Sequence, residues 1–585
     1  MVGFGCPAWA NEEDFRSIEL FTGDQPDVVS SGRSPRPASL TAENVSVITA
    51  AEIAALNAHT LTDILLAIPG VQTIQNRTPG TVAPLMIQGS KWNHVLVLVD
   101  NVPINNLSDD VPDISSIPAQ IIERVEVVKG AASSSWGSAL GGVINVITKL
   151  PNTDRPVSGE VSASVGRSST NDDRGELAGT AWNVGYYVSG GRLHSEGLLP
   201  NNHVDLDHVY GKFRHELSSR TSLTLSSLYT NNTSGQGVFS GINADQEIRQ
   251  LLASATLESR PSDRLSLEGS VKTRMMNGQV WADSGGTVLQ RSESDETSIF
   301  GCLNAGWRGD QNRISAGVDF EDAKVHVQVQ RRANLIPFDR QAERVGVYFN
   351  DAFTVGRLAL IPSVRYDHTG TGGELFSPSF GVTYALSDNS VLRGYTGRGY
   401  SINTLGSNDN TEKVWTSQVG FETGEIPYLW LKTTLFRNDT WNIGYAAPKA
   451  QQLKQGVEIE FKTLPVFHSS LSAGYTFIDS RDDQTHQRVP EVPHRSVKVG
   501  ITYDNPSYFR ALLIGNYVDW NANAGELSAD DMLWDLHVGR SFAAGEGVDI
   551  ELFFSIHNIF NGKQFTTLSQ VNPGRWAEAG FRCRF

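Results

Sequence analysis

The sequence predicts an all-β membrane barrel that follows a smaller α+β domain, and three observations lead to this fold class. The chain has 585 residues, too many for one ordinary soluble core. It contains no run of about 18 apolar residues that would form a membrane-spanning helix. Beyond residue 149, segments of alternating apolar and polar side chains are separated by turn residues. Composition alone also permits a large soluble β-rich protein, because barrel strands escape detection by hydropathy.

Composition and motif content exclude several classes of function. Charged residues make up 19% of the chain and the net charge is −16, which argues against nucleic acid as a partner. Cys6, Cys302 and Cys583 lie far apart in sequence and do not indicate a disulfide framework. The chain has no G-x-S-x-G, H-E-x-x-H or C-x-x-C motif, so we predict that it is not an enzyme.

The first 44 residues show no sustained periodicity. Ala8-Trp9-Ala10 has the small-x-small form of a secretory cleavage site, so we interpret residues 1–10 as the remnant of a signal peptide. Residues 11–44 are polar and punctuated by glycine and proline, which predicts a flexible extended segment. A short β-prone patch without a local partner lies within it and is suited to adding as a strand to another protein's sheet. This patch consists of Asp27, Val28, Val29, Ser30 and Ser31.

Residues 45–150 have the pattern of a compact α+β domain. The expected elements are a strand at 45–49, helices at 50–56 and 60–68, and strands at 71–74, 84–89 and 94–100. Thr60 and Asp63 form a capping signal for the second helix, and Pro69-Gly70 ends it. Two further strands are expected within 122–149, joined by a small-residue loop at 130–138. Glycines in this segment permit tight turns and close strand approach.

Landmarks of this domain resemble the plug domain of TonB-dependent outer-membrane receptors. The segment 122–149, IERVEVVKGAASSSWGSALGGVINVITK, resembles the end of that plug, where the family's chain enters its barrel. Three earlier segments also resemble successive plug signatures: IPGV at 68–71, MIQG at 86–89 and VLVLVD at 95–100. Two residues depart from the pattern: Gln88 stands where the family often has Arg, and Asn101 where it often has Gly. The first departure puts in doubt any plug-to-barrel ion pair made from position 88.

The resemblance covers residues 27–585 and implies a 22-stranded antiparallel transmembrane β-barrel, residues 151–585, occluded by an N-terminal plug domain, residues 45–150. With the family as a guide, ten tight turns and the two end strands give about 22 strands, the even number expected of a large bacterial barrel. A barrel this wide cannot be filled by its own side chains. The tight turns are expected near residues 182, 219, 261, 310, 356, 388, 426, 465, 506 and 545.

The opposite end of the barrel is expected to carry polar loops, including 232–246, 279–291 and 326–340, of about 6 to 16 residues each. Short loops of this kind favour a compact ligand. The last strand, 576–585, has apolar residues at every second place and ends in Phe585. It resembles the signal read by the barrel-assembly machinery.

The resemblance implies TonB-dependent active import of a scarce, compact, metal-containing ligand across the outer membrane of a Gram-negative bacterium. Residues 27–31 would be the TonB box. The expected partners are TonB, outer-membrane lipid, the barrel-assembly machinery and a small-molecule metal chelate. The phrase HVLVLVD at 94–100 favours the cobalamin-transporter branch, and a ferric siderophore is the other candidate ligand. A passive porin or channel, and a surface receptor or adhesin without energised transport, are the alternatives.

The ligand is expected where the outer loops meet outward-facing plug loops. The candidate ligand-binding residues, which would otherwise be solvated turn residues, are Gln75, Asn76, Arg77, Thr78, Asn101, Asn105, Asn106, Asp109 and Asp110. His194, His203 and His208, with Asp205 and Asp207 nearby, are weak metal candidates whose spacing fits no closed site, so no metal site is predicted. Asp109-Asp110 and Asp482-Asp483 could supply oxygen ligands for calcium in the outer loops, and no other cofactor is expected.

Overall fold

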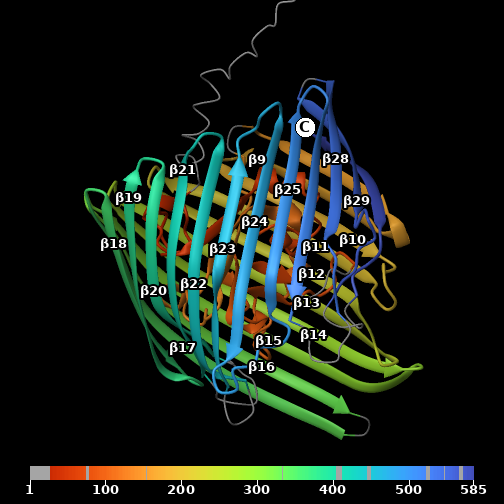
Figure 1. The fold of residues 1–585 in the computed structure, drawn as a ribbon, viewed down its shortest axis with the longest axis horizontal. Helices are drawn as coiled ribbons and strands as arrows, with labels where there is room; N and C mark the ends of the chain where they lie inside the picture. Colours follow the sequence, from red (N-terminus) through yellow and green to blue (C-terminus); the bar gives the residue numbers. More distant parts are fainter. Residues whose placement is uncertain are drawn as a thin grey trace, which may run out of the picture.

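A closed antiparallel barrel of 22 strands surrounds a smaller N-terminal domain, here called the plug, in the computed structural model of the chain (Figure 1). The structure describes residues 27–73, 78–152, 155–331, 334–402, 411–444, 450–521, 528–545, 547–565 and 571–585. No helix within these ranges is long and apolar enough to cross a membrane. The fold class that the sequence predicts is therefore confirmed.

The plug is built on a five-stranded sheet in the order β1-β6-β7-β4-β5, in which β4 and β7 are parallel and the other pairs antiparallel. Its strands are β1 (Asn44–Thr49), β4 (Val95–Val99), β5 (Val102–Pro103), β6 (Ile122–Lys129) and β7 (Gly142–Thr148), with a separate pair β2 (Val71–Thr73) and β3 (Leu85–Ile87). Its helices are α2 (Ala50–Ala55), α3 (Leu61–Leu66) and α4 (Ser133–Trp136), with short 3₁₀ turns η1 (Ala38–Leu40), η2 (Trp92–His94), η3 (Ile114–Ser116) and η4 (Ala119–Ile121).

Local sequence explains why these plug elements form. Thr49 and Glu52 make a reciprocal capping box at the start of α2. Asp63 accepts the backbone N–H groups of Thr60 and His59 at the start of α3. Gly142, at φ +144°, lies so close to β6 that an added Cβ would be 2.4 Å from the carbonyl oxygen of Val128. The expected loop at 130–138 instead contains the one-turn helix α4.

The barrel wall closes between its last and first strands, where β31 pairs with β8. The strands are β8 (Ser158–Gly166), β9 (Asn171–Ala181), β10 (Val184–Ser195), β11 (Val204–Ser218), β12 (Thr221–Phe239), β13 (Ile242–Ser262), β14 (Leu265–Ser284), β15 (Thr287–Arg308), β16 (Asn312–Arg331), β17 (Asn334–Val355), β18 (Leu358–Thr369), β19 (Gly373–Ser387), β20 (Ser390–Ile402), β21 (Thr411–Ile426), β22 (Leu429–Ile443), β23 (Ala450–Thr463), β24 (Ser469–Asp482), β25 (Pro493–Asn505), β26 (Phe509–Trp520), β28 (Leu533–Gly545), β29 (Val548–His557) and β31 (Trp576–Arg584). The 3₁₀ turn η5 (Arg167–Ser169) and a small pair, β27 (Ala529–Asp530) with β30 (Gln564–Phe565), lie between wall strands.

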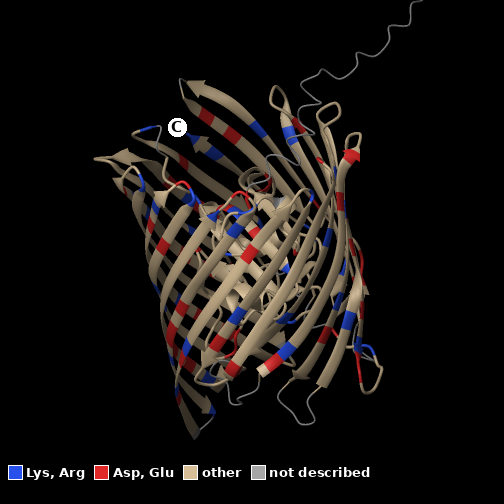
Figure 2. Ribbon diagram, turned by 90° about the vertical axis from the view of Figure 1, so that its left-hand side faces the viewer, with Lys and Arg blue, Asp and Glu red and all other residues tan. Residues whose placement is uncertain are grey.

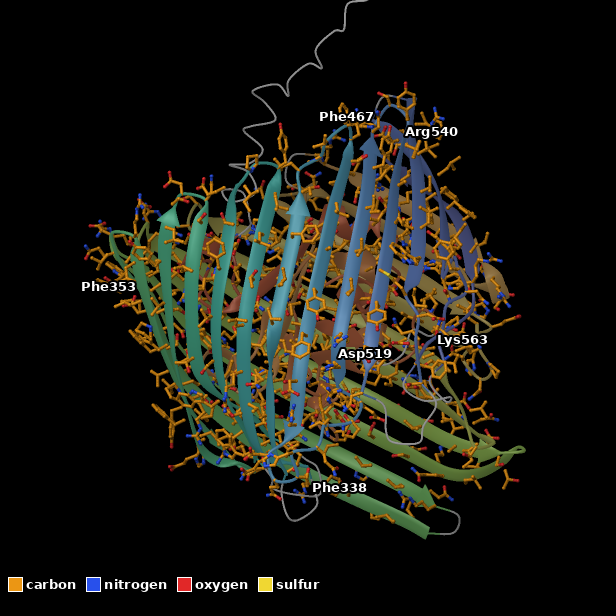
Figure 3. All side chains as sticks on the ribbon, in the orientation of Figure 1. Phe338, Phe353, Phe467, Asp519, Arg540 and Lys563 are labelled. Carbon is orange, nitrogen blue, oxygen red and sulfur yellow. The ribbon has the colours of Figure 1, made fainter. Side chains whose placement is uncertain are left out.

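The two ends of the barrel differ. One end, here called the turn end, carries the ten short connections and the C-terminus, and these connections lie close to the predicted positions. Figure 3 places Phe467 and Arg540 at this end and Phe338 at the opposite, loop end. At the loop end, the prediction that residues 232–246, 279–291 and 326–340 form loops is wrong, because these residues are mostly strand. Strand pairing continues through these segments in the hairpins β12–β13, β14–β15 and β16–β17, and the last two project beyond their neighbours (Figure 1).

Side chains alternate between the two faces of the wall. On β31, Glu578 and Arg582 are buried toward the plug, whereas Phe581 and Phe585 are about two-fifths exposed on the outer face. Figure 2 shows charged residues interspersed along an otherwise largely uncharged wall. Apolar side chains exposed on the outside of other strands include Val209, Val271, Leu303, Val419 and Leu435. This outer apolar band suits lipid, and the polar inner face suits the plug.

Candidate coupling and ligand sites

Residues 27–36, here called the N-terminal segment, are folded against the plug. Val28 is buried and exchanges backbone hydrogen bonds with Arg36, at 2.8 and 3.1 Å. The backbone N–H groups of Val29 and Ser30 donate to the Glu126 carboxylate at 3.0 and 2.9 Å. The Ser30 carbonyl oxygen accepts from the Trp136 indole N–H at 2.6 Å. The predicted TonB box therefore lies in this structure with its backbone polar groups largely occupied.

This arrangement corrects the expectation of flexibility for 11–44 wherever the chain is described. Residues 1–26, which include the expected signal-peptide remnant and the first part of that segment, lie outside the described residues. From residue 27 onward the chain is packed, and the expected patch without a local partner has one in Arg36. Composition could not show this, because the partners Glu126 and Trp136 are about 100 residues away in sequence.

Arg33 ties the N-terminal segment to the barrel. Its guanidinium donates to both oxygens of Asp319 on β16, at 2.6 and 2.7 Å. It also lies 4.4 Å from the ring centre of Trp136 and 4.7 Å from that of Tyr348. Asp319 receives a further hydrogen bond from Arg365 on β18 at 2.6 Å. One side chain thus joins the segment, the plug and the wall.

A buried ion-pair cluster holds the other side of the plug. Lys129, at the end of β6, is within bonding distance of Glu458 and is 3.1 Å from Glu460, both on β23. Lys129 and Glu458 have side chains no more than 1% exposed. Gln88 is also buried, and both polar atoms of its side chain lack a partner among the described residues. The doubt about an ion pair from position 88 is therefore justified, and Lys129 supplies the plug cation instead.

The predicted ligand residues are dispersed over two plug loops. Gln75, Asn76 and Arg77 lie outside the described residues. Thr78 is buried at 2% exposure, and its backbone N–H and hydroxyl both donate to Asn202 of an outer loop, at 3.1 and 2.7 Å. Asn101 occupies a left-handed turn at φ +64°, as the sequence allows, and its carbonyl oxygen accepts from Lys272.

The second plug loop is anchored in part to the barrel wall. The side chain of Asn105 bonds the backbone of Val95, Val97 and Asp110 and so shapes the loop itself. Arg274 on β14 donates to Asn106 at 3.2 Å. Asp109 is exposed and accepts from the backbone of Val111 at 3.0 Å, whereas Asp110 is 9% exposed. Of the described candidates in this loop, Asp109 is the most accessible to a ligand.

A cleft of about 150 Å³ lies between the plug and one part of the wall. The plug side consists of residues 56–67 and 78–83, and the wall side comes from β26, β28, β29 and β31. The polar and aromatic wall residues are Asn516, Asp535, His537, His557, Asn558, Asn572 and Trp576. Of the predicted site residues that the structure describes, Thr78 alone lines this cleft. No local motif marks the other lining residues, because only the docking of the plug inside the barrel brings the two sides together.

The outer histidines and acidic pairs do not form one site. His194 is 2.8 Å from Asp205, His203 is 3.9 Å from Asp245, and His208 is buried with its Nε2 unpaired among the described residues. No group of three or more His, Cys, Asp or Glu in the described chain could hold a metal ion. Asp482 caps its own loop through Gln484 and Thr485. The loop that carries Asp109 instead bonds β14 and β15, far round the barrel, through Asn106 and Leu107.

Comparison with known proteins gives a consistent family. Residues 37–143 match the TonB-dependent Receptor Plug Domain, and residues 152–559 match the TonB dependent receptor-like beta-barrel. The vitamin B12 transporter BtuB of Vibrio vulnificus (strain CMCP6) is 25% identical over 594 residues, which cover 94% of this chain and 93% of that protein. The FpvAI–pyocin S2 complex superposes with a TM-score of 0.84 at 14% identity, covering 96% of this chain and 86% of that one. The ferric yersiniabactin uptake receptor FyuA from Yersinia pestis gives 0.80 at 17% identity, covering 95% and 100%.

Proposed function

This chain belongs to the TonB-dependent receptor family of the Gram-negative outer membrane, and from that premise we propose that it imports a compact metal-containing ligand by TonB-dependent transport. In the outer membrane, the turn end of such a barrel faces the periplasm and the loop end faces the outside of the cell. The observation that carries the proposal is the storage of residues 27–31 against Glu126 and Trp136, beside the barrel contact of Arg33. A stored strand of this kind is of use only if an event in the molecule releases it.

Release of the N-terminal segment follows if ligand binding and undocking of the segment are coupled equilibria. A ligand that binds better to the plug conformation with the N-terminal segment undocked shifts the population toward that conformation. The freed backbone of residues 27–31 then adds as a strand to TonB, and force transmitted from the periplasm remodels the plug. A passive porin and an energy-independent adhesin would need neither the plug nor the stored strand.

Cobalamin is the ligand that we propose first. The vitamin B12 transporter BtuB is similar to this chain over more than nine-tenths of both lengths. A ferric siderophore is the second candidate, since ferric-siderophore uptake receptors share the fold, although at identities that support the fold alone. Calcium held by Asp109-Asp110 or Asp482-Asp483 stays a prediction, which calorimetry with and without a chelator would test.

The test compares binding with uptake. Purified protein is titrated with cyanocobalamin, a panel of ferric siderophores and haem, and cells are then assayed for accumulation of whatever binds. The Val28→Pro variant loses the N–H that a β-strand partner requires, so we expect ligand binding within about twofold of wild type and uptake near background. Uptake by this variant at the wild-type rate, or uptake unaffected by a protonophore, would show the proposal to be wrong.

A further inference from the structure

The plug is attached unevenly round the barrel wall. Between β20 and β25 its polar contacts include those of Arg393, Gln418, Lys432, Glu458 and Lys498, on five different strands. Neighbouring strands β26 and β28 differ, because within the described chain no hydrogen bond or ion pair joins either of them to the plug. Strands β8, β13 and β24 also lack such a contact, but each is flanked on both sides by strands with inward bonds. Strands β16 and β17 bond the N-terminal segment instead, through Arg33 and Gly32.

The cleft described above lies at this weakly attached part of the wall. It extends inward from Asn558, Asn572 and Pro573 of the last outer loop, between α2–α3 and strands β26 and β28. β26 contacts the plug through apolar packing of Met86 against Val518 and Trp520. Asn516 Oδ1 on the wall and Thr62 Oγ1 on the plug line it, and neither atom has a partner among the described residues. A volume of about 150 Å³ has room for several waters. The plug and the wall are therefore not close-packed here.

Two plug residues from the turn after α2 close the inner end of the cleft. Asn57, held at φ +48°, contacts Arg582 on β31 and donates to Ser555 on β29 at 3.2 Å. His59 lies between Asp172 on β9, at 2.6 Å, and Glu578 on β31, at 3.3 Å. Both residues belong to one short turn, so a single local movement of that turn would break both contacts.

We propose that during import the plug parts from the barrel along this face, so that a polar ligand descends between α2–α3 and strands β26 and β28. Asn57 and His59 are the positioning residues that keep the inner end closed in the resting state. This inference rests on the proposed import function. Parting a few strands away, at β23, would instead expose the buried Lys129 cluster, whose charges lose their partners when the plug moves away.

The experiment measures thiol accessibility in importing cells. The native cysteines are replaced by serine, and a reporter cysteine is introduced as Asn516→Cys in the cleft. The matched control is Asn438→Cys on β22, a residue 2% exposed whose side chain accepts from Thr416 at 2.8 Å. A membrane-impermeant maleimide is added outside, with and without a protonophore, and accumulation of labelled ligand is measured on the same cells. Thr62→Cys, on the plug wall of the cleft, is the second reporter should Asn516→Cys fail to assemble.

We expect energised import to raise the labelling rate at position 516 by about fivefold or more and the rate at 438 by less than about twofold. Ligand accumulation with equal rises at both positions, with a rise at 438 alone, or with no change at 516 and 62 would overturn the proposed route while leaving import intact. Absence of accumulation for every ligand in wild-type cells would instead overturn the import function itself, and the route with it.

Discussion

At the scale of single residues, Lys129 illustrates how buried charge holds the plug. It is the plug cation facing Glu458 and Glu460 in a buried site, so Lys129→Gln leaves two carboxylates there without it. Breaking a buried pair in this way costs about 3–5 kcal/mol. We expect the variant plug to be cleaved by protease much faster than the wild type in detergent. Lys462→Gln is the control: its pair with Glu52 is 36% and 42% exposed, and the expected loss is below about 1 kcal/mol. Equal effects of the two substitutions would contradict the prediction.

His59 predicts a pH dependence of plug docking. Burial alone would lower the pKa of His59, but the carboxylates of Glu578 and Asp172 outweigh burial and hold this pKa well above its usual value. A group whose pKa is raised on folding contributes stability below its unfolded pKa of about 6.5 and loses it as the pH rises through the folded pKa. We therefore expect protease cleavage of the plug to accelerate as the solution becomes alkaline.

The His59→Gln variant isolates this contribution. Its plug should be less stable than the wild type at pH 6, and the difference between the two proteins should shrink as the pH rises. The neighbouring groups Asp63, Asp172, Arg174 and Glu578 remain in both proteins, so only the difference reports on His59. A difference independent of pH from about 6 to 10 would contradict the assignment.

At the scale of elements, the N-terminal segment predicts a shift in its own docking equilibrium. Arg33→Ala removes the bond to Asp319 and both aromatic contacts, while Arg365 still neutralises Asp319. We expect a loss of about 1–3 kcal/mol of docking free energy and a larger mobile fraction of a spin label at residue 27. Arg192→Ala removes an exposed ion pair between β10 and β11 and should leave the mobile fraction of the spin label unchanged. An immobile label in Arg33→Ala would contradict the prediction.

The sequence predicts most elements of this fold because local signals specify them. Turn chemistry places the ten tight turns, and the glycines flanking β6 and β7 predict their close approach. The failures are equally physical. Alternation continues through Val325, Val327 and Val329, so the outer hairpin is strand where polarity favoured a loop. The cleft residues Asn516, His537 and Trp576 could not be predicted, since only the docking of the plug inside the barrel places α3 beside their strands.

At the scale of the whole molecule, the barrel wall and the sheet of the plug are separate β-sheets. The sheet β1-β6-β7-β4-β5 and the 22-stranded wall share no strand pairing, so the wall does not need the plug's sheet to close. Deleting residues 27–149 behind a secretion signal should therefore give an assembled barrel that still resists denaturation by detergent until heated. Because a wall of this size encloses far more space than its own side chains fill, this barrel should conduct ions continuously in planar bilayers. The full-length Arg33→Ala protein is the control and should stay sealed, since Lys129, His59 and their partners still hold the plug. An unassembled deletion variant would mean that plug contacts direct barrel closure, and an assembled but silent one would mean that the wall collapses inward without its plug.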